Sequence, residues 1–468
     1  MTAVARRRWR KNRVRSRAFV ASGPGLTLPA LIDRYGGAVE TLYLTGPRPG
    51  GGVDGFGSWL AAELPDGWAP AGHYLARLHR PVLRFERRDG AAIEIHRAAS
   101  WFGEREVTPS DASDALDLLD LALSERFDEW AHTLATPATT GRDLWLRSLP
   151  DDAAYPALTD EQQTLIRSTS GQGRWELFTG ERGELDELHG FDMRFGYAAL
   201  LWGLGVGPAE HDDRNEYAGQ RRGRYRVRAT VPAGWDHVGL LPYAEDDGAT
   251  WTYPDEPGRT FTTWADGAEV HVALAHGWQL DILERLLLQD GRPLDGWQRR
   301  MIDVRDRLAD AYTTGETDRT VAKLAADAAR LVLLSTVGAF HGAPRAVTRS
   351  AERTQDIPAD AEGLDFVDGR WSWTETTGAA WPETSHPEWA TAIWARCRAR
   401  ILTHRRSGTG ALHVPRRSLV AIRQDAIYLD HHPGWTDDGS VGRLRHTTAV
   451  RRRLPAPRTP AELLEVTR

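Results

Sequence analysis

The sequence predicts a multidomain α+β protein, and three observations support this. The chain has 468 residues, more than one compact core usually holds, so two to three domains are expected. Strand-like patterns recur along the chain, at residues 82–85, 91–96, 223–232, 268–274 and 418–429. Helical periodicity also recurs, over residues 111–134, 294–312 and 318–336.

The composition is that of an ordinary globular protein and excludes several classes. Hydrophobic residues make up 41% of the chain, charged residues make up 26%, and the formal net charge is −6. This charge excludes a globally basic coat for nucleic acid, but it is compatible with a local basic cleft. The single cysteine, Cys397, can form neither a disulfide framework nor a cysteine-based zinc site. Because no run of about 18 apolar residues occurs, we expect no membrane span.

Residue usage also indicates where the protein works. A single cysteine is typical of intracellular proteins. Lys11 and Lys323 are the only lysines, and every other basic residue among the 59 is an arginine. GC-rich coding explains this bias, so we expect a cytoplasmic protein from a bacterium with a GC-rich genome. An arginine at a position that usually holds lysine is therefore compatible with retained function.

The N-terminal region divides into a basic arm and an α/β domain. Residues 6–17 carry eight basic residues and no acid, which is typical of either a solvated tail or an arm that binds phosphates. Within 18–140, strand-like runs precede the amphipathic helix, for which Ser110 is the expected N-cap. The TPATTG stretch at 136–141 is predicted to be a linker.

Two segments carry residues that suit phosphoryl-transfer chemistry. In GFDMRFGYA (190–198), Asp192 follows an apolar residue, although a surface aspartate has the same pattern. In the second segment Arg319, Lys323 and Arg330 are spaced by four and seven residues, which places them on one face of a helix. Such a row of cations suits a triphosphate, but it is also typical of a solvated helix face.

A third segment, SLVAIRQDAIYLD (418–430), has the pattern of a β-hairpin. Two β-rich runs flank an Arg-Gln-Asp sequence, with Asp425 near the expected tip. A hairpin tip can hold a carboxylate rigidly against a neighbouring strand. The alternative is a plain surface turn.

Together and in this order, the three segments resemble motifs A, B and C of the family B DNA polymerases, especially the protein-primed type of viruses and linear plasmids. Motif A of that family reads D-x-x-S-L-Y-P, and DMRFGYA (192–198) keeps its Asp and Tyr. Motif B reads K-x-x-x-N-S-x-Y-G-x-F, and RLVLLSTVGAF (330–340) keeps its Ser, Gly and Phe, with arginine replacing lysine. Motif C reads D-T-D-S, and RQDAIY (423–428) keeps its second Asp, whereas the first is arginine.

The resemblance implies roles for the matching residues. Asp192 and Asp425 would be the catalytic residues and would bind two ions of Mg²⁺ or Mn²⁺. Tyr197 would act as a steric gate that selects the sugar. The nucleotide-binding residues would be Arg319, Lys323, Arg330, Tyr197 and Gly338.

Two flanking stretches extend the resemblance over about residues 160–446. STSGQGRWELF (168–178) resembles the Y-x-G-G region that precedes motif A in the family, and VGRLR (441–445) resembles the G-K-L-x stretch that follows motif C. These matches imply that Gly173, Arg174, Arg443 and Arg445 bind DNA.

The implied fold is an α+β right-hand polymerase, with a palm, fingers and an N-terminal RNase H-like domain of the exonuclease type. Residues 1–140 lack the D-x-E motif of proofreading members, so that domain would be degenerate and without catalytic acids. Only 43 residues (468 − 425) follow Asp425, so the thumb would be reduced or absent. The predicted divisions are a basic arm (1–17), the exonuclease-like domain (18–140), the palm with motif A (141–290), the fingers with motif B (291–340), and the palm with motif C and a short tail (341–468).

The implied function is template-directed DNA synthesis by two-metal nucleotidyl transfer, without proofreading. The partners would be a DNA template-primer, dNTPs and a priming or processivity protein. Arg423 beside Asp425 would oppose metal binding. An alternative is therefore a catalytically inactive, polymerase-derived protein that binds DNA or assists replication.

A second alternative is a metal-dependent hydrolase. Its ligands would come from Asp430-His431-His432 or from His211-Asp212-Asp213. Neither cluster has the spacing of a ligand set on one element, because adjacent residues of a strand face opposite sides.

Overall fold

A computed structural model describes the chain as two compact units, each built from two stretches of sequence. Unit 1 comprises Met1–Asp152 and Arg299–Ser385, and unit 2 comprises Ala153–Gln298 and His386–Arg468. The described residues are 16–467 except 52, 61, 72–82, 104, 151–152, 154, 172, 181, 220–221, 246–249, 316, 343–344, 352–353, 355–356, 358–361, 368–369 and 378–384. The predicted basic arm therefore lies outside the described residues, apart from its last two positions.

The units do not follow all of the predicted domain boundaries, since the predicted segment 141–290 is divided after Asp152 and the predicted segment 291–340 after Gln298. The predicted segment 341–468 is divided after Ser385, and its first part belongs to unit 1. None of the helices in the described parts of the chain is long and apolar enough to cross a membrane.

Unit 1 contains a five-stranded mixed sheet in the order β1-β2-β5-β4-β3. β1 and β2 are parallel, β2 and β5 are parallel, and β3 and β4 complete the sheet as antiparallel strands. The strands are β1 (Arg17–Ala21), β2 (Thr41–Thr45), β3 (Trp68–Ala71), β4 (Leu83–Arg87) and β5 (Ala92–Arg97). A separate antiparallel sheet has the order β15-β17-β16, with β15 (Arg345–Ala351), β16 (Glu362–Val367) and β17 (Arg370–Thr377).

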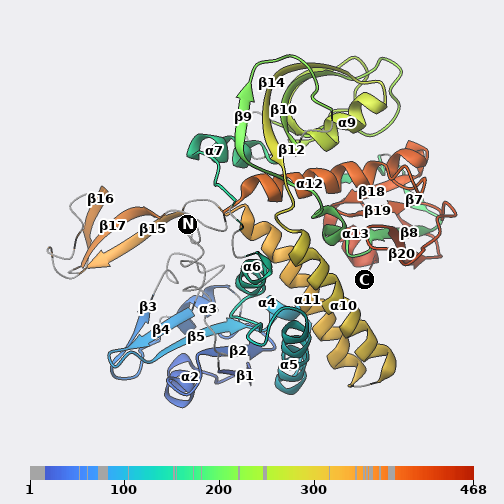
Figure 1. The fold of residues 1–468 in the computed structure, drawn as a ribbon. Coiled ribbons are helices and arrows are strands. Elements are labelled where there is room, and N and C mark those ends of the chain that lie inside the picture. The colour runs from blue at the N-terminus through green and yellow to red at the C-terminus, as the bar shows by residue number, and fades with distance from the viewer. Residues whose placement is uncertain are drawn as a thin grey trace. The chain divides into compact units, whose positions relative to one another are not determined.

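Two long helices, α10 and α11, run side by side, and α5 and α6 pack against α11 (Figure 1). The helices of this part are α2 (Leu28–Tyr35), α3 (Val53–Leu60), α4 (Ala99–Phe102), α5 (Pro109–Arg126), α6 (Pro137–Ser148), α10 (Asp295–Thr314), which begins in unit 2, and α11 (Arg319–Phe340). Gly141 allows α6 to approach α11 closely, because a Cβ at this position would collide with the Thr336 side chain. The apolar side chains of α11 that face α5 and α6, such as Ala328 and Val332, are fully buried.

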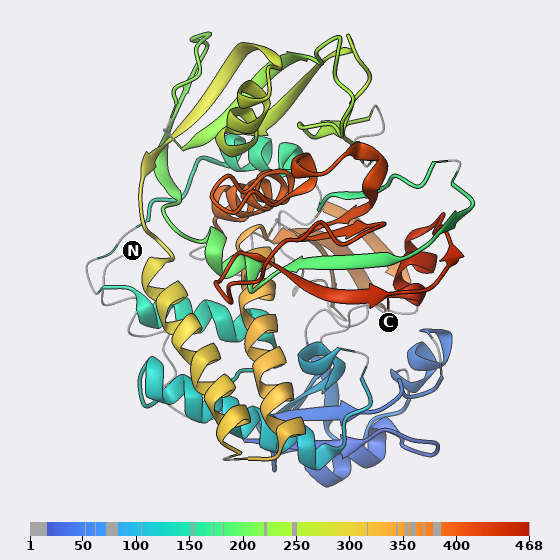
Figure 2. The ribbon, with the colours of Figure 1, turned by 90° about the vertical axis from the view of Figure 1, so that its right-hand side faces the viewer.

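Unit 2 contains two larger sheets with helix α12 between them (Figures 1 and 2). The first is antiparallel in the order β20-β8-β19-β18-β6 and joins the early strands of the unit to the last ones. The second has the order β13-β10-β14-β9 and curves around α9. α12 (Pro387–Leu402) is buried on nearly all sides, as expected for a helix between two layers.

The bounds of the remaining elements follow the chain. The strands are β6 (Trp175–Leu177), β7 (Glu184–Leu185), β8 (Leu188–Met193), β9 (Gly205–Asp212), β10 (Gly223–Thr230), β11 (Tyr243–Ala244), β12 (Trp251–Thr252), β13 (Thr260–Asp266), β14 (Gln279–Asp290), β18 (Leu419–Arg423), β19 (Ala426–Leu429), β20 (Leu444–Val450) and β21 (Leu454–Pro455). The helices are α7 (Asp160–Thr169), α8 (Gly196–Leu200), α9 (Gly267–Ala275) and α13 (Pro460–Val466), with 3₁₀ turns at Ala411–His413 and Arg416–Ser418.

Three local predictions were wrong. The predicted strand at 268–274 is helix α9, which Asp266 and Glu269 cap reciprocally. The predicted linker at 136–141 is the first turn of α6, where Thr136 and Thr139 form a capping box. The predicted helix at 111–134 ends at Arg126, and its N-cap is Thr108, because Pro109 occupies the first helical position.

Candidate functional site

Four neighbouring strands of unit 2 place one row of side chains on the same face of a sheet. Arg423 of β18 lies opposite Ala426 of β19, Ala426 lies opposite Asp192 of β8, and Asp192 lies opposite Arg445 of β20. Residues directly opposite one another in antiparallel strands point to the same face. Asp192 therefore shares its row with an arginine on each side.

The segments that carry Asp192 and Asp425 are direct neighbours. The backbone N–H of Met193 donates to the carbonyl oxygen of Asp425 over 2.9 Å. Both aspartates are half-buried at the same end of the sheet, and Figure 2 shows β8 in green between the red C-terminal strands. The strand pairing thus makes neighbours of the two backbone segments that carry the carboxylates singled out in the sequence.

Arg174 and helix α12 contact the hairpin tip that carries Asp425. Gln424 has a left-handed φ of 53°, and its N–H donates to the carbonyl of Arg174 over 2.6 Å. The thiol of Cys397 on α12 lies 3.9 Å from the Gln424 carbonyl oxygen. Burial, with a smaller contribution from the Asp425 carboxylate, raises the pKa of the Cys397 thiol, so this cysteine is protonated and packs as an apolar residue.

Arg445 forms an ion pair with Asp192. Its Nη2 lies 3.4 Å from Asp192 Oδ2, with side-chain exposures of 37% and 22%. The Nε of Arg445 is buried, and no hydrogen-bond partner for it occurs among the residues that the structure describes. The pair is therefore loose, and the guanidinium still has a donor to offer. The sequence predicted a DNA contact for Arg445, and that role stays a prediction.

Arg443, the other predicted DNA contact on this strand, is held by its neighbours. It lies 3.5 Å from the Asp438 carboxylate and donates to Nδ1 of His404 over 2.7 Å. Burial, aided by Arg400 and Arg443, lowers the pKa of His404 to about 4. His404 is therefore neutral at pH 7 and can accept the hydrogen bond from Arg443.

Arg174 does not fit the predicted contact with DNA. Its side chain is fully buried, it forms an ion pair with Glu176, and it donates to the Gly239 carbonyl over 2.9 Å. Its guanidinium also stacks 4.2 Å from the centre of the Tyr253 ring. Arg174 is thus a structural residue that supports the hairpin tip. Gly173 beside it is exposed and lies against Gln424, so its predicted DNA contact remains open.

The predicted triphosphate cations lie on α11 in unit 1. Arg319, Lys323 and Arg330 are exposed, whereas Leu324 and Ala328 on the other side of the helix are buried. Gly338 is exposed too, and a Cβ at that position would meet nothing within 4 Å. The predicted amphipathic character of this helix is confirmed, and the binding role of its cations stays a prediction.

Tyr197 follows a bend immediately after β8. Phe195 caps the short helix α8 with a left-handed φ of 46°, and Tyr197 in that helix is half-buried. Arg194, in the same bend, forms an ion pair of 2.5 Å with Asp437. The chain therefore turns from β8 into α8 within the few residues between Asp192 and Tyr197. The role of Tyr197 in sugar selection stays a prediction.

The described residues contain no group of three or more His, Cys, Asp or Glu side chains that could hold a metal ion. The side chains of the two clusters proposed for the hydrolase alternative form hydrogen bonds and ion pairs with other protein groups. His211 contacts Glu284 at 3.2 Å, and Asp212 is bound by Arg285 at 2.6 Å. His431 contacts Asp430 at 2.7 Å. The hydrolase alternative is thus left without a ligand set in the described part of the chain.

No family model matches the sequence, and no curated protein is significantly similar to it. Solved structures do match. Phi29 DNA polymerase complexed with primer-template DNA and incoming nucleotide substrates matches with a TM-score of 0.62 and 12% identity, over 94% of this chain and 85% of that one. An orthorhombic crystal form of Phi29 DNA polymerase matches with a TM-score of 0.58 and 13% identity, over 92% and 79% of the two chains.

This chain has the fold of Phi29 DNA polymerase. A complex of that polymerase with single-stranded DNA matches as well, with a TM-score of 0.56 and 13% identity over 91% of this chain and 78% of that chain. The predicted resemblance to the protein-primed polymerases is confirmed in the fold, and so is the α+β class. At 12–13% identity the likeness concerns the fold alone.

Proposed function

We propose that this chain is a template-directed DNA polymerase that works by nucleotidyl transfer. The observation that carries the proposal is the pairing of β8 with β19, which makes the Asp192 and Asp425 segments neighbours. The fold of a polymerase whose structure holds primer-template DNA and incoming nucleotides supports the same activity. Unit 2 would supply the palm and the α10–α11 pair the fingers, while the sheet β1–β5 would be the exonuclease-type domain without its catalytic acids.

The site fits divalent ions that arrive together with substrate phosphates. Mg²⁺ is usually held by one or two carboxylates, with water and phosphate oxygens completing its shell. Asp192 and Asp425 supply those carboxylates, but Asp192 contacts Arg445 and the described residues offer no third acidic ligand. Two ions of Mg²⁺ or Mn²⁺ bound there would activate the primer hydroxyl and stabilise the leaving group.

The chain's own residues would position the reactants. Arg445 and Arg423, which lie in the same row, would contact phosphate oxygens, because guanidinium groups suit such contacts. Arg319, Lys323 and Arg330 would neutralise the triphosphate, and Tyr197 would contact the sugar. A priming or processivity protein would help to hold the template-primer.

Primer extension with a labelled DNA primer-template, in Mg²⁺ and separately in Mn²⁺, tests the proposal. We expect Asp192→Asn and Asp425→Asn each to lower the incorporation rate by about 100-fold or more, since each removes a charged ligand of the reacting centre. The matched control is Asp186→Asn, because the Asp186 side chain is 96% exposed just before β8. Equal incorporation by the wild type and the three variants would contradict the polymerase proposal.

The Asp192–Arg445 ion pair favours a second candidate, a polymerase-derived protein that binds DNA without catalysis. An arginine on each side of Asp192 gives the row a net positive charge, which suits a phosphate better than a bare metal ion. Under this alternative, the wild-type protein binds primer-template DNA but incorporates no nucleotide in either metal. Gel-shift and extension assays on the same preparation separate the two candidates.

A further inference from the structure

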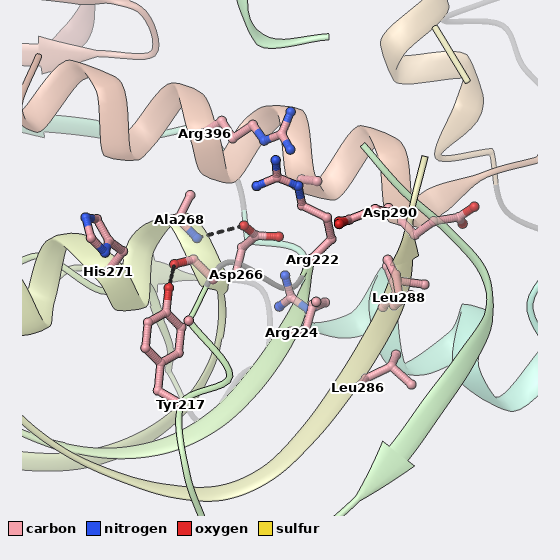
Figure 3. Close-up of a pocket in the computed structure, with 17 residues that line it drawn as sticks. Tyr217, Arg222, Arg224, Asp266, Ala268, His271, Leu286, Leu288, Asp290 and Arg396 are labelled. Carbon is pink, nitrogen blue, oxygen red and sulfur yellow. Dashed lines mark hydrogen bonds between the residues drawn. The ribbon is translucent and has the colours of Figure 1, made fainter. Parts of the chain in front are cut away.

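A second candidate site lies in unit 2 between the curved sheet and α12. A cavity of about 510 Å³ is lined by residues of β10, β14, α9 and α12 (Figure 3). Its lining includes none of the residues assigned above to metal, nucleotide or DNA binding. A volume of this size is typical of pockets that hold a small organic ligand.

Arg224 gives this cavity a buried cation, two of whose nitrogens have no partner among the described residues. Its side chain is only 4% exposed, and its Nη2 donates to the carbonyl of Trp264 over 3.3 Å and to Thr169. Its Nε and Nη1 are also buried, and neither has a partner in the described part of the chain. Burial lowers the pKa of Arg224 to about 10, so it remains charged at pH 7. Buried donors without acceptors are costly, and a bound anion would satisfy them.

Two further arginines converge on the same space. Figure 3 shows the guanidinium groups of Arg222 and Arg396 pointing toward one another above Arg224. Arg396 donates to the carbonyls of Leu200 and Gly203, over 2.9 and 2.8 Å, so its charge is held in place. Arg222 is exposed, and it has neither an ion pair nor a side-chain hydrogen bond among the described residues. Three like charges around one cavity favour an anion between them.

Three acidic side chains, Asp266, Asp290 and Glu388, also line the cavity, and among the described residues none of them forms an ion pair with these arginines. Asp266 caps α9 by accepting the N–H of Ala268 over 3.0 Å. Glu388 is 4% exposed, and its Oε1 contacts Nδ1 of His386 at 2.9 Å. Its Oε2 is buried, and no partner for it lies among the described residues. A complementary ligand would therefore bring acceptors to the arginines and a donor to Glu388.

The remaining wall is apolar. Ile166, Leu286 and Leu288 line the cavity and are almost fully buried. Leu286 and Leu288 lie on β14, on the side of the cavity where Figure 3 shows Arg224. Such a wall suits a flat or aliphatic group attached to the anion.

We propose that this cavity binds a phosphomonoester of nucleotide size, with the phosphate held by Arg222 and Arg224 and a hydroxyl or amino group bonded to Glu388. Guanidinium groups pair with phosphate through charge-assisted hydrogen bonds, and an apolar wall accommodates the base. The phosphomonoester comes either from a free nucleotide or from the 5′ end of a nucleic acid strand. The proposal does not depend on the polymerase activity, because the two sites share no residue.

Calorimetric titration of the full chain tests the proposal. The titrations use EDTA and the Asp192→Asn/Asp425→Asn background, so that binding at the carboxylate pair does not contribute. The probes are inorganic phosphate, pyrophosphate, dAMP, deoxyadenosine, and a short oligonucleotide with a 5′-phosphate or a 5′-hydroxyl. We expect dAMP to bind at least about tenfold more tightly than deoxyadenosine, because only dAMP carries the anion.

Arg222→Gln is the decisive variant, since Arg222 is exposed and its loss leaves no buried group unpaired. We expect it to weaken binding of dAMP at least about tenfold, as for loss of one charge-assisted hydrogen bond. The matched control is Arg228→Gln on β10, the strand that follows Arg222, because Arg228 is exposed and does not line the cavity. If the 5′-phosphorylated oligonucleotide alone binds in an Arg222-dependent way, the source is a nucleic acid end. If no probe binds at millimolar concentration, or if Arg222→Gln binds like Arg228→Gln, the proposal is overturned.

Discussion

Replacing Arg445 by glutamine should strengthen divalent metal binding at the Asp192–Asp425 pair. At the observed separation of 3.4 Å, Coulomb's law with an effective dielectric constant of about 20 gives an attraction of roughly 5 kcal/mol. Both side chains are partly exposed, at 37% and 22%, and pairs of this kind contribute about 1 kcal/mol or less. A metal ion that binds Asp192 must break this ion pair, so its binding free energy is weakened by about the same 1 kcal/mol. We therefore expect the dissociation constant for the metal to fall about fivefold in Arg445→Gln.

The assay is a Mn²⁺ titration followed by electron paramagnetic resonance, without DNA or nucleotide, so that its readout does not depend on activity. The matched control is Arg451→Gln, which removes an equal charge just after the same strand, where Arg451 is exposed. Subtracting its effect removes the contribution of net charge. If Arg445→Gln and Arg451→Gln bind Mn²⁺ equally, the ion pair does not oppose the metal, and the electrostatic argument for the second candidate function fails with it.

Three further predictions concern stability. Arg398→Met should lower the free energy of unfolding by about 3–5 kcal/mol in urea denaturation. Glu269 is 1% exposed and lies 2.7 Å from Arg398 Nε, so the variant leaves it as an unpaired buried charge. An unchanged urea midpoint would contradict this. Gly141→Ala should cost about 1–3 kcal/mol, because the added methyl group collides with Thr336 between α6 and α11; a stabilised variant would show that the two helices are not in contact. The pKa of His404 in the folded protein is about 4, below its ordinary value of 6.5, so the unfolded chain binds more protons between these values. The contribution of His404 to stability is therefore present above pH 6.5 and lost as the pH falls toward 4. In His404→Gln the urea midpoint should depend less on pH in that window. Equal slopes of midpoint against pH in both proteins would contradict this.

Elements with one dominant periodicity were predictable from the sequence. β10 alternates from Tyr225 onward, with Val227 fully buried between the exposed Arg226 and Arg228, and the structure has it as a strand close to the predicted bounds. α11 repeats its apolar residues at helical spacing over 22 residues. In both cases the burial pattern is local, so a short window contains the whole signal.

Segments decided by end effects were not predictable in the same way. AEVHVAL alternates like a strand, yet Asp266 and Glu269 form a capping box that starts a helix there. The Asp-x-x-Glu spacing is present in the sequence, and the capping box that it forms prevails over the alternation. The same holds for Thr136 and Thr139, where a threonine-rich stretch resembles a loop by composition and starts a helix by hydrogen bonding.

In the candidate site, some residues could be predicted from the sequence and others could not. Asp192 and Asp425 could be singled out because each keeps a recognisable motif position, and the pairing of β8 with β19 makes their segments neighbours. The Asp192–Arg445 pair could not be predicted, because it depends on the register between two strands far apart in the sequence, and a shift of one residue would turn Arg445 to the other face. The burial of Arg174 was hidden for the same reason, since its partners Gly239 and Tyr253 are remote in sequence.

The row of side chains across β18, β19, β8 and β20 decides how a polymerase could work with this site. It holds one carboxylate, Asp192, between Arg423 and Arg445, so the row without substrate is net positive and should bind a bare metal ion poorly. A nucleoside triphosphate reverses this balance, because its phosphates pair with the arginines and bring acceptor oxygens for the metal. Metal and nucleotide would then bind with positive coupling, each raising the affinity for the other by the same factor. A protein that only binds DNA has no reason to show this coupling, so the dependence of Mn²⁺ affinity on dNTP is the property by which the two candidate functions differ most.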